Sequence, residues 1–245
     1  MAYFIKFNGT SSQNLFKIRK APTRVMANKK IELFDINTMD GNIYKDYGTY
    51  EAFDLELECV MIGNFSIENI QKVKEMFMER EGKLEFSDEE GIYYKARLNN
   101  IIPFDETSLV SGEFPLSFSV FPKAYLTVGD EEVTVNNNDI LTNLGNVESE
   151  PLIIVNGAVG NFKIKVVKEI TAQESIEQEI NFQELTGESF IIDCHLEDCY
   201  SENKTNFNKY MTLNSDFIKL YKGDNKIMLE PTGMTVKIIP RWARL

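Results

Sequence analysis

The first half of the chain alternates between apolar and polar positions, as half-buried β-strands do. In residues 53–61 (FDLELECVM), every second side chain is apolar and most of those between are carboxylates. Residues 114–120 (FPLSFSV) repeat this alternation. Residues 83–98 predict a hairpin, because the acidic, glycine-containing turn at 88–91 separates two stretches rich in apolar and aromatic residues. These patterns predict an antiparallel sheet with one buried face.

One segment of the first half has a helical period instead. Between residues 66 and 80, apolar side chains recur every three or four positions, which predicts a single amphipathic helix near 66–80. Ser66 is expected to cap its first turn, and Gly82 is expected to end it. The apolar stripe consists of Ile67, Ile70, Val73 and Phe77.

The second half consists of short apolar stretches separated by turn residues. This spacing indicates a β-sandwich. The Asn156-Gly157 pair predicts a tight turn that joins two of the strands as a hairpin. Further turns are expected at residues 186–187 and 223–225. The candidate strands are residues 151–156, 161–169, 177–183, 188–193, 216–221, 226–230 and 234–239.

A polar, acidic stretch at residues 124–142 marks the expected boundary, so we predict domains of residues 1–130 and 131–245. Residues 21–50 form the longest stretch without clear periodicity, and a loop of this length is usually functional or disordered. Basic side chains precede the first acidic residue, Glu32. They are Lys6, Lys17, Arg19, Lys20, Arg24, Lys29 and Lys30. Two interpretations are open: a solvated loop, or a basic segment that docks on an acidic neighbouring copy.

Composition narrows the range of functions. The 245 residues include 38 acidic and 26 basic side chains, for a net charge of −12, which disfavours stable nucleic-acid binding. The 43% hydrophobic residues are enough for a real core. We expect no signal peptide and no membrane insertion, because no apolar run approaches the ~18–20 residues of a span. Three cysteines, an odd number, fit a reducing compartment best.

Residues that carry chemistry are scarce. His195 is the only histidine, so one chain cannot build a two-histidine metal site. Cys194, Asp198 and Cys199 lie near it, but their spacing matches no common zinc module, and ordinary strand and turn roles are favoured. The sequence has no phosphate-binding glycine loop and no nucleophile elbow. We therefore expect no enzyme, no cofactor and no metal.

The single tryptophan lies at the C-terminal end of the sequence, in IIPRWARL. Trp242 has two interpretations: an aromatic platform for a sugar, or a core residue of a final strand. In the second interpretation, which is favoured, Pro240 ends the preceding strand, and Arg241 and Arg244 reach acidic partners.

Together these segments resemble the distal tail proteins of long-tailed bacteriophages. The resemblance is carried by MDGNIYKDYGTYEAFDLELECVM (39–61), by the helix followed by a G-x-L-x-F hairpin, by TNLGNVESEPLIIVNG (142–157) and by VKIIPRWARL (236–245). The resemblance covers essentially the whole chain. The chain has no counterpart of the large insertion that some relatives carry in the second domain, so it is similar to the compact form of the family.

The resemblance implies a mainly β protein of two β-sandwich domains. The first is tail-tube-like, with one flanking helix and a long belt loop, here residues 21–48, that embraces the next subunit. The second is galectin-like. Six copies would form a ring at the virion tail tip, after synthesis in the bacterial host cytoplasm from a phage or prophage gene.

That ring would join the tail tube protein to tail-associated hub proteins and to receptor-binding or baseplate proteins, and DNA would pass through its lumen. An acidic protein repels DNA phosphates, which suits a conduit. The expected subunit-interface residues are Lys17, Arg19, Lys20, Arg24, Lys29, Lys30, Tyr44 and Tyr47. The expected contacts of the C-terminal tail with a partner are Arg241, Trp242 and Arg244.

Three alternatives remain open. A carbohydrate-binding module of a phage adhesion device would need a polar and aromatic cluster on one strand face, which residues 161–169 and 216–221 do not provide convincingly. A cell-wall hydrolase is poorly supported by a lone histidine. A tail-tube subunit would polymerise into tubes, and the second domain argues against it.

Overall fold

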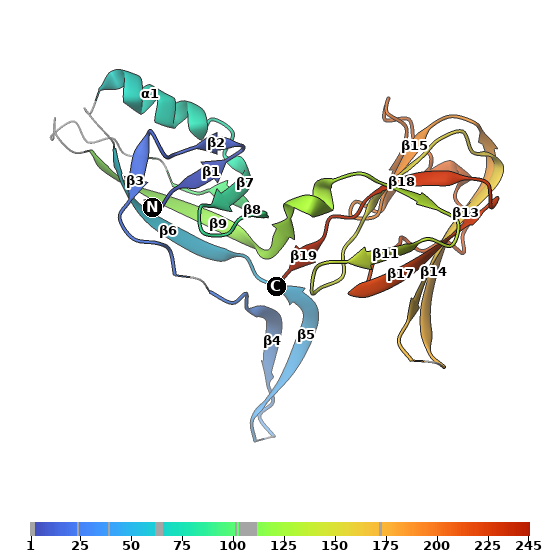
Figure 1. Cartoon of the computed structure of the whole chain (residues 1–245). Helices are drawn as coiled ribbons and strands as arrows, with labels where there is room; N and C mark the ends of the chain where they lie inside the picture. Colours follow the sequence, from blue (N-terminus) through green and yellow to red (C-terminus); the bar gives the residue numbers. More distant parts are fainter. Residues whose placement is uncertain are drawn as a thin grey trace. The chain divides into compact units, whose positions relative to one another are not determined.

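The computed structural model describes residues 3–23, 25–38, 40–61, 66–100, 102, 112–171 and 173–245. The chain divides into two compact units, Met1–Ala124 with Leu245, and Tyr125–Arg244. Both units are built mainly from β-strands, and the α-helix found in the described residues belongs to the first unit (Figure 1). The predicted mainly β class is confirmed.

Unit 1 contains a sheet in the order β2-β1-β7-β8-β9-β6-β3. Its strands are β1 (Ile5–Phe7), β2 (Thr10–Ser11), β3 (Phe16–Ile18), β6 (Phe53–Met61), β7 (Glu81–Phe86), β8 (Ile92–Leu98) and β9 (Glu113–Leu126). The alternation predicted for β6 and β9 is confirmed, because the two strands pair antiparallel and bury the same face, with Leu57 opposite Leu116. The predicted β7–β8 hairpin also forms, and Gly91 in its turn has a φ of +77°.

Helix α1 (Ile67–Met76) packs its apolar side against this sheet. Phe77, which follows the helix, has its ring 5.4 Å from that of Phe7 and 6.0 Å from that of Phe118. The predicted cap is confirmed, since Ser66 Oγ accepts a hydrogen bond from the backbone N–H of Asn69.

Two details of the predicted helix are wrong. Ile67 is almost fully exposed, so the buried stripe begins later, with Val73. The helix ends at Met76, because Phe77 leaves the helical conformation when its ring enters the core, and Gly82 does not act as the stop. Instead, Gly82 lies in β7, where a Cβ atom would collide with the side chain of Asn8.

Residues 21–48 contain regular structure where a loop was expected. Strands β4 (Lys29–Asp35) and β5 (Asn42–Tyr50) pair antiparallel in a separate two-stranded sheet. We call residues 29–50 the arm.

Unit 2 is a sandwich of two sheets, in the orders β10-β18-β12-β15-β16 and β11-β17-β13-β14. Phe162 and Phe182 from one sheet meet Phe190 from the other, with the Phe182 and Phe190 rings 4.9 Å apart. The predicted sandwich is confirmed. Its strands are β10 (Val133–Asn136), β11 (Ile140–Asn143), β12 (Leu152–Val155), β13 (Val159–Glu169), β14 (Ser175–Thr186), β15 (Phe190–Asp193), β16 (Asp198–Tyr200), β17 (Gly223–Glu230) and β18 (Thr235–Ile239).

The predicted hairpin at Asn156-Gly157 is wrong. Strands β12 and β13 belong to different sheets, because β12 is already paired on both sides, with β15 and β18. The turn therefore carries the chain across the sandwich, and the inward side chains of both strands, such as Ile153 and Ile164, fill the same core. Residues 216–221 are not a strand either, since only Leu220 makes an isolated bridge, to Ser149.

The polar stretch at 124–142 contains regular structure. It holds a 3-10 turn, η1 (Thr127–Asp130), and the strands β10 and β11. Residues 223–225, expected as a turn, begin strand β17.

Candidate functional site

The arm presents large apolar side chains on both of its faces. Directly opposed residues of an antiparallel pair share a face, and neighbours along a strand alternate. Leu33 lies opposite Tyr44 on one face, together with Ile31, whereas Phe34 lies opposite Ile43 on the other. These side chains and that of Tyr47 are between 43% and 67% exposed.

Polar contacts on the arm are made within the arm itself. Lys29 donates a hydrogen bond of 2.8 Å to Asp46, which raises the pKa of Lys29 and lowers that of Asp46, so that the pair stays ionised at neutral pH. The Tyr47 hydroxyl donates to Glu32, which raises the pKa of Tyr47, and Lys45 lies over the Tyr47 ring at 4.7 Å.

These contacts change the character expected for this segment. Residues 29–50 carry three lysines and four acidic residues, so the arm has no net positive charge. Large apolar and aromatic side chains are exposed among these charges, and the predicted interface residues Tyr44 and Tyr47 are two of them. Lys30 lies near the Tyr47 ring, at 5.8 Å.

The described basic residues predicted before the arm lie on β3 or just after it. Lys17 is exposed on β3, and Lys20 is exposed just after that strand. Arg19 forms an ion pair with Glu113 of β9. Arg24 lies outside the described residues.

Two of the C-terminal residues expected to contact a partner, Arg241 and Trp242, make contacts inside unit 2. Arg241 makes a two-pronged ion pair with Asp193, with Nη1–Oδ1 and Nη2–Oδ2 distances of 2.7 and 3.1 Å. Trp242 is buried, and its carbonyl accepts a hydrogen bond from the N–H of Leu126. Of the three predicted residues, only Arg244 is exposed.

Asp193 is held as a carboxylate by this contact. Its burial acts to raise its pKa, but the hydrogen bonds and charge of Arg241 outweigh burial and lower that pKa below its ordinary value. Nearby, His195 Nδ1 lies 2.7 Å from Glu150 Oε2. No group of three or more His, Cys, Asp and Glu side chains within the described residues is arranged to hold a metal ion.

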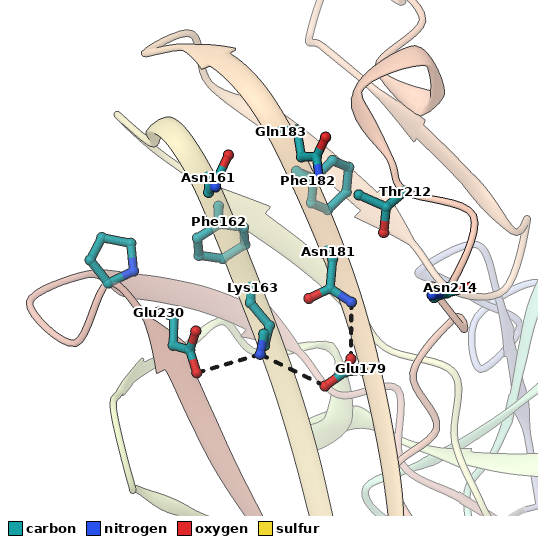
Figure 2. Close-up of a pocket in the computed structure, with 11 residues that line it drawn as sticks. Asn161, Phe162, Lys163, Glu179, Asn181, Phe182, Gln183, Thr212, Asn214 and Glu230 are labelled. Carbon is teal, nitrogen blue, oxygen red and sulfur yellow. Dashed lines mark hydrogen bonds and ion pairs between the residues drawn. The ribbon is translucent and has the colours of Figure 1, made fainter.

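A groove of about 590 Å³ lies on β13 and β14 in unit 2 (Figure 2). Lys163 Nζ is 3.5 Å from Glu230 and 4.0 Å from Glu179, and Asn181 donates to Glu179 at 3.2 Å. The groove is lined by Asn161, Phe162, Lys163, Glu179, Asn181, Phe182, Gln183, Thr212, Asn214, Glu230 and Pro231.

Sequence reasoning missed this groove because it looked for a polar and aromatic cluster on residues 161–169 and 216–221, and not on β14. The true neighbour of β13 on this side is β14, paired with it along almost its whole length. The signal was the row of polar residues alternating with buried ones on both strands, with Asn181 and Gln183 on β14.

In the part of the chain that the structure describes, no helix has the length and apolar character needed to cross a membrane.

The fold is similar to those of two solved phage proteins. SPP1 Dit (gp 19.1), a paradigm of the hub adsorption apparatus in phages that infect Gram-positive bacteria, is similar with a TM-score of 0.65 and 15% sequence identity, over 97% of this chain and 98% of that one. A chain of the phage P2 baseplate, in its activated conformation with Ca, is similar with a TM-score of 0.56 and 10% identity, over 100% and 99% of the two chains. No protein-family model and no curated protein matches the sequence. The predicted resemblance to distal tail proteins is thus confirmed at the level of the fold.

Proposed function

We propose that this protein is a structural, non-enzymatic hub of a phage tail tip, and that six copies form a ring. The ring joins the tail tube to tail-associated proteins and to receptor-binding or baseplate proteins, and its lumen lets DNA pass. The observation that carries the proposal is the arm, with apolar side chains exposed on both faces, on a chain with the fold of phage hub proteins.

The arm needs a partner surface for physical reasons. An isolated two-stranded hairpin is at best marginally stable in water, and contiguous exposed apolar side chains mark interaction surfaces. Since Leu33 and Tyr44 point to one side and Phe34 and Ile43 to the other, a partner gains most apolar contact by enclosing the arm.

A second copy of the chain is the partner that fits a ring. When the arm of one copy binds a different surface of the next, the contact is head-to-tail, and such contacts close into rings if the rotation allows. The net charge of −12 suits a channel for DNA, because phosphates are repelled rather than held.

The test is the mass of the purified protein in solution by light scattering. A ring of six has a mass of six times 28.2 kDa, about 169 kDa. The variant Leu33→Asp/Tyr44→Asp places two charges on one face of the arm, and we expect it to be monomeric with unchanged circular dichroism. Deleting residues 21–48 should have the same effect.

The matched control is Ile67→Asp/Leu196→Asp, which adds the same charges at exposed apolar positions outside the arm. We expect the control to keep the mass of the ring. A wild-type protein that is monomeric at every concentration, or an arm variant that still forms the ring, contradicts the proposal. Long tubes in electron micrographs of the wild type would favour a tail-tube subunit instead.

A further inference from the structure

The groove on unit 2 is built at an irregularity of the sheet. The register of β13 and β14 shifts between Gly160 and Phe162, so two residues of β14, Gln183 and Glu184, oppose the single residue Asn161 in a β-bulge. Glu184, within this bulge, has a φ of +58°, which is uncommon for a residue other than glycine, and Gly160 on the facing strand has a φ of +74°. Bulges re-aim side chains and occur often beside functional sites, and strained residues cluster there as well.

Three primary amides at the groove are open to a ligand. Asn161, Gln183 and Asn214 are exposed, and none of their side chains has a hydrogen-bond partner within the described residues. Figure 2 shows Asn161 and Gln183 on neighbouring strands at one end of the groove. Each amide offers two donors and one acceptor oxygen in a plane.

Charges at the groove largely compensate one another. Lys163 lies between Glu179 and Glu230, so its ammonium is already paired with carboxylates. A phosphate or a nucleic acid needs unpaired Lys or Arg, and the lining residues supply none. The groove therefore favours a neutral ligand.

An extended peptide is a poor fit, because the edge of β14 is already occupied. The N–H groups of Thr212 and Asp216 donate to the carbonyls of Asn181 and Glu179, so the segment after η2 (Asn208–Tyr210) covers this edge. Strand addition requires a free edge.

We propose that the groove binds a neutral saccharide. Sugar hydroxyls both donate and accept hydrogen bonds, which matches the open amides, and a volume of about 590 Å³ lies in the usual range for ligand sites. The groove continues past Gln183 and Thr212 to a second hollow lined by Lys209, Tyr210 and the fully exposed Leu213, where Lys209 Nζ lies over the Tyr210 ring at 4.7 Å. The Leu213 side chain gives the apolar C–H face of a sugar ring a surface to lie on. The inference goes beyond the hub function and does not depend on it.

The test uses the full-length protein on an array of defined bacterial oligosaccharides. The array contains neutral hexose and N-acetylhexosamine chains, with glycerol-phosphate polymers as anionic comparators. The strongest ligand is then titrated by calorimetry. We expect binding to neutral chains and none to the glycerol-phosphate polymers.

Two variants of equal composition locate the site. Asn161→Ala/Gln183→Ala removes two groove amides, and Gln173→Ala/Asn203→Ala removes one exposed amide of each kind elsewhere in unit 2. We expect the first to weaken binding at least tenfold and the second to leave it unchanged.

Absence of binding across the array, equal loss in both variants, or a preference for the phosphate polymers overturns the proposal. So does binding of an unglycosylated tail protein at this groove in place of a saccharide. The solution mass of the groove variant should equal that of the wild type, so a failure of saccharide binding is separable from a failure of ring assembly.

Discussion

The ion pair between Asp193 and Arg241 should be a large single contribution to the stability of unit 2. The Asp193 side chain is 5% exposed and that of Arg241 is 26% exposed. Replacing Arg241 by methionine keeps most of the aliphatic chain but leaves a buried carboxylate without its cation. Removing one partner of a buried pair typically costs about 3–5 kcal/mol.

The structure places the expected cost at or below the lower limit of that range. Asp193 keeps two backbone hydrogen bonds, from the N–H groups of His195 at 3.1 Å and Leu196 at 3.3 Å. The guanidinium is also partly in contact with water, which weakens its attraction for the carboxylate. We therefore expect Arg241→Met to lower the free energy of unfolding by about 2–3 kcal/mol at pH 7.

Urea unfolding followed by tryptophan fluorescence measures this directly, because Trp242 is the single tryptophan and is buried in unit 2. The expected change corresponds to a midpoint shift of roughly 1–2 M urea. The control Arg244→Met, at an exposed arginine three residues along, should change the free energy of unfolding by less than about 0.5 kcal/mol.

The dependence on pH provides a second check. In the wild type the folded-state pKa of Asp193 is lowered, so its stabilisation is fully present above the unfolded value of about 3.9 and is lost as the pH falls through the folded-state pKa. In Arg241→Met, burial dominates and raises that pKa, so the variant recovers stability as the pH falls. The gap between the two proteins should narrow from pH 7 towards pH 4.

A cost below about 0.5 kcal/mol, similar to that of an exposed ion pair, would refute this reasoning. A gap that widens on acidification would also refute it. The double variant Asp193→Asn/Arg241→Met separates the two contributions, because it should regain part of the loss if the cost arises from an uncompensated charge.

Three further outcomes are expected. Gly145→Ala should destabilise unit 2 by about 1–3 kcal/mol, since its Cβ atom would lie 2.1 Å from the carbonyl oxygen of Ala243, whereas Gly233→Ala, in open space, should be nearly neutral by the same assay. Phe190→Ala should cost about 3–5 kcal/mol, because the ring lies among three other aromatic rings, and a cost below 1 kcal/mol would contradict the described core. Burial raises the pKa of each cysteine thiol to about 12, so a thiol reagent at pH 8 should react slowly with the native protein and rapidly with all three after denaturation. These thiols are Cys59, Cys194 and Cys199.

Local sequence patterns were sufficient to predict those elements that bury a single face. The alternation in β6 and β9 and the serine cap of α1 could be predicted, because each depends on residues only a few positions apart. The end of α1 could not, because it depends on where the ring of Phe77 packs.

Long-range pairing could not be predicted from the same patterns. The Asn156-Gly157 turn suits a hairpin locally, yet β12 is flanked by strands that lie tens of residues away in the sequence. The arm lacks a polar face, so its strands show none of the alternation that marks a half-buried strand. The groove escaped notice for a related reason, since it requires the pairing of β13 with β14 and the position of residues 212–214.

The path of the chain through the arm has a mechanical consequence. Only Glu51 and Ala52 separate β5 from β6, so a force applied to the arm enters the sheet through the first residue of β6. Strand β6 is tied to β9 along eight consecutive residue pairs, and β9 runs on without a break from unit 1 to Leu126 in unit 2. A force on the arm is therefore carried to the start of unit 2 through covalent bonds and one hydrogen-bonded ladder of the same chain.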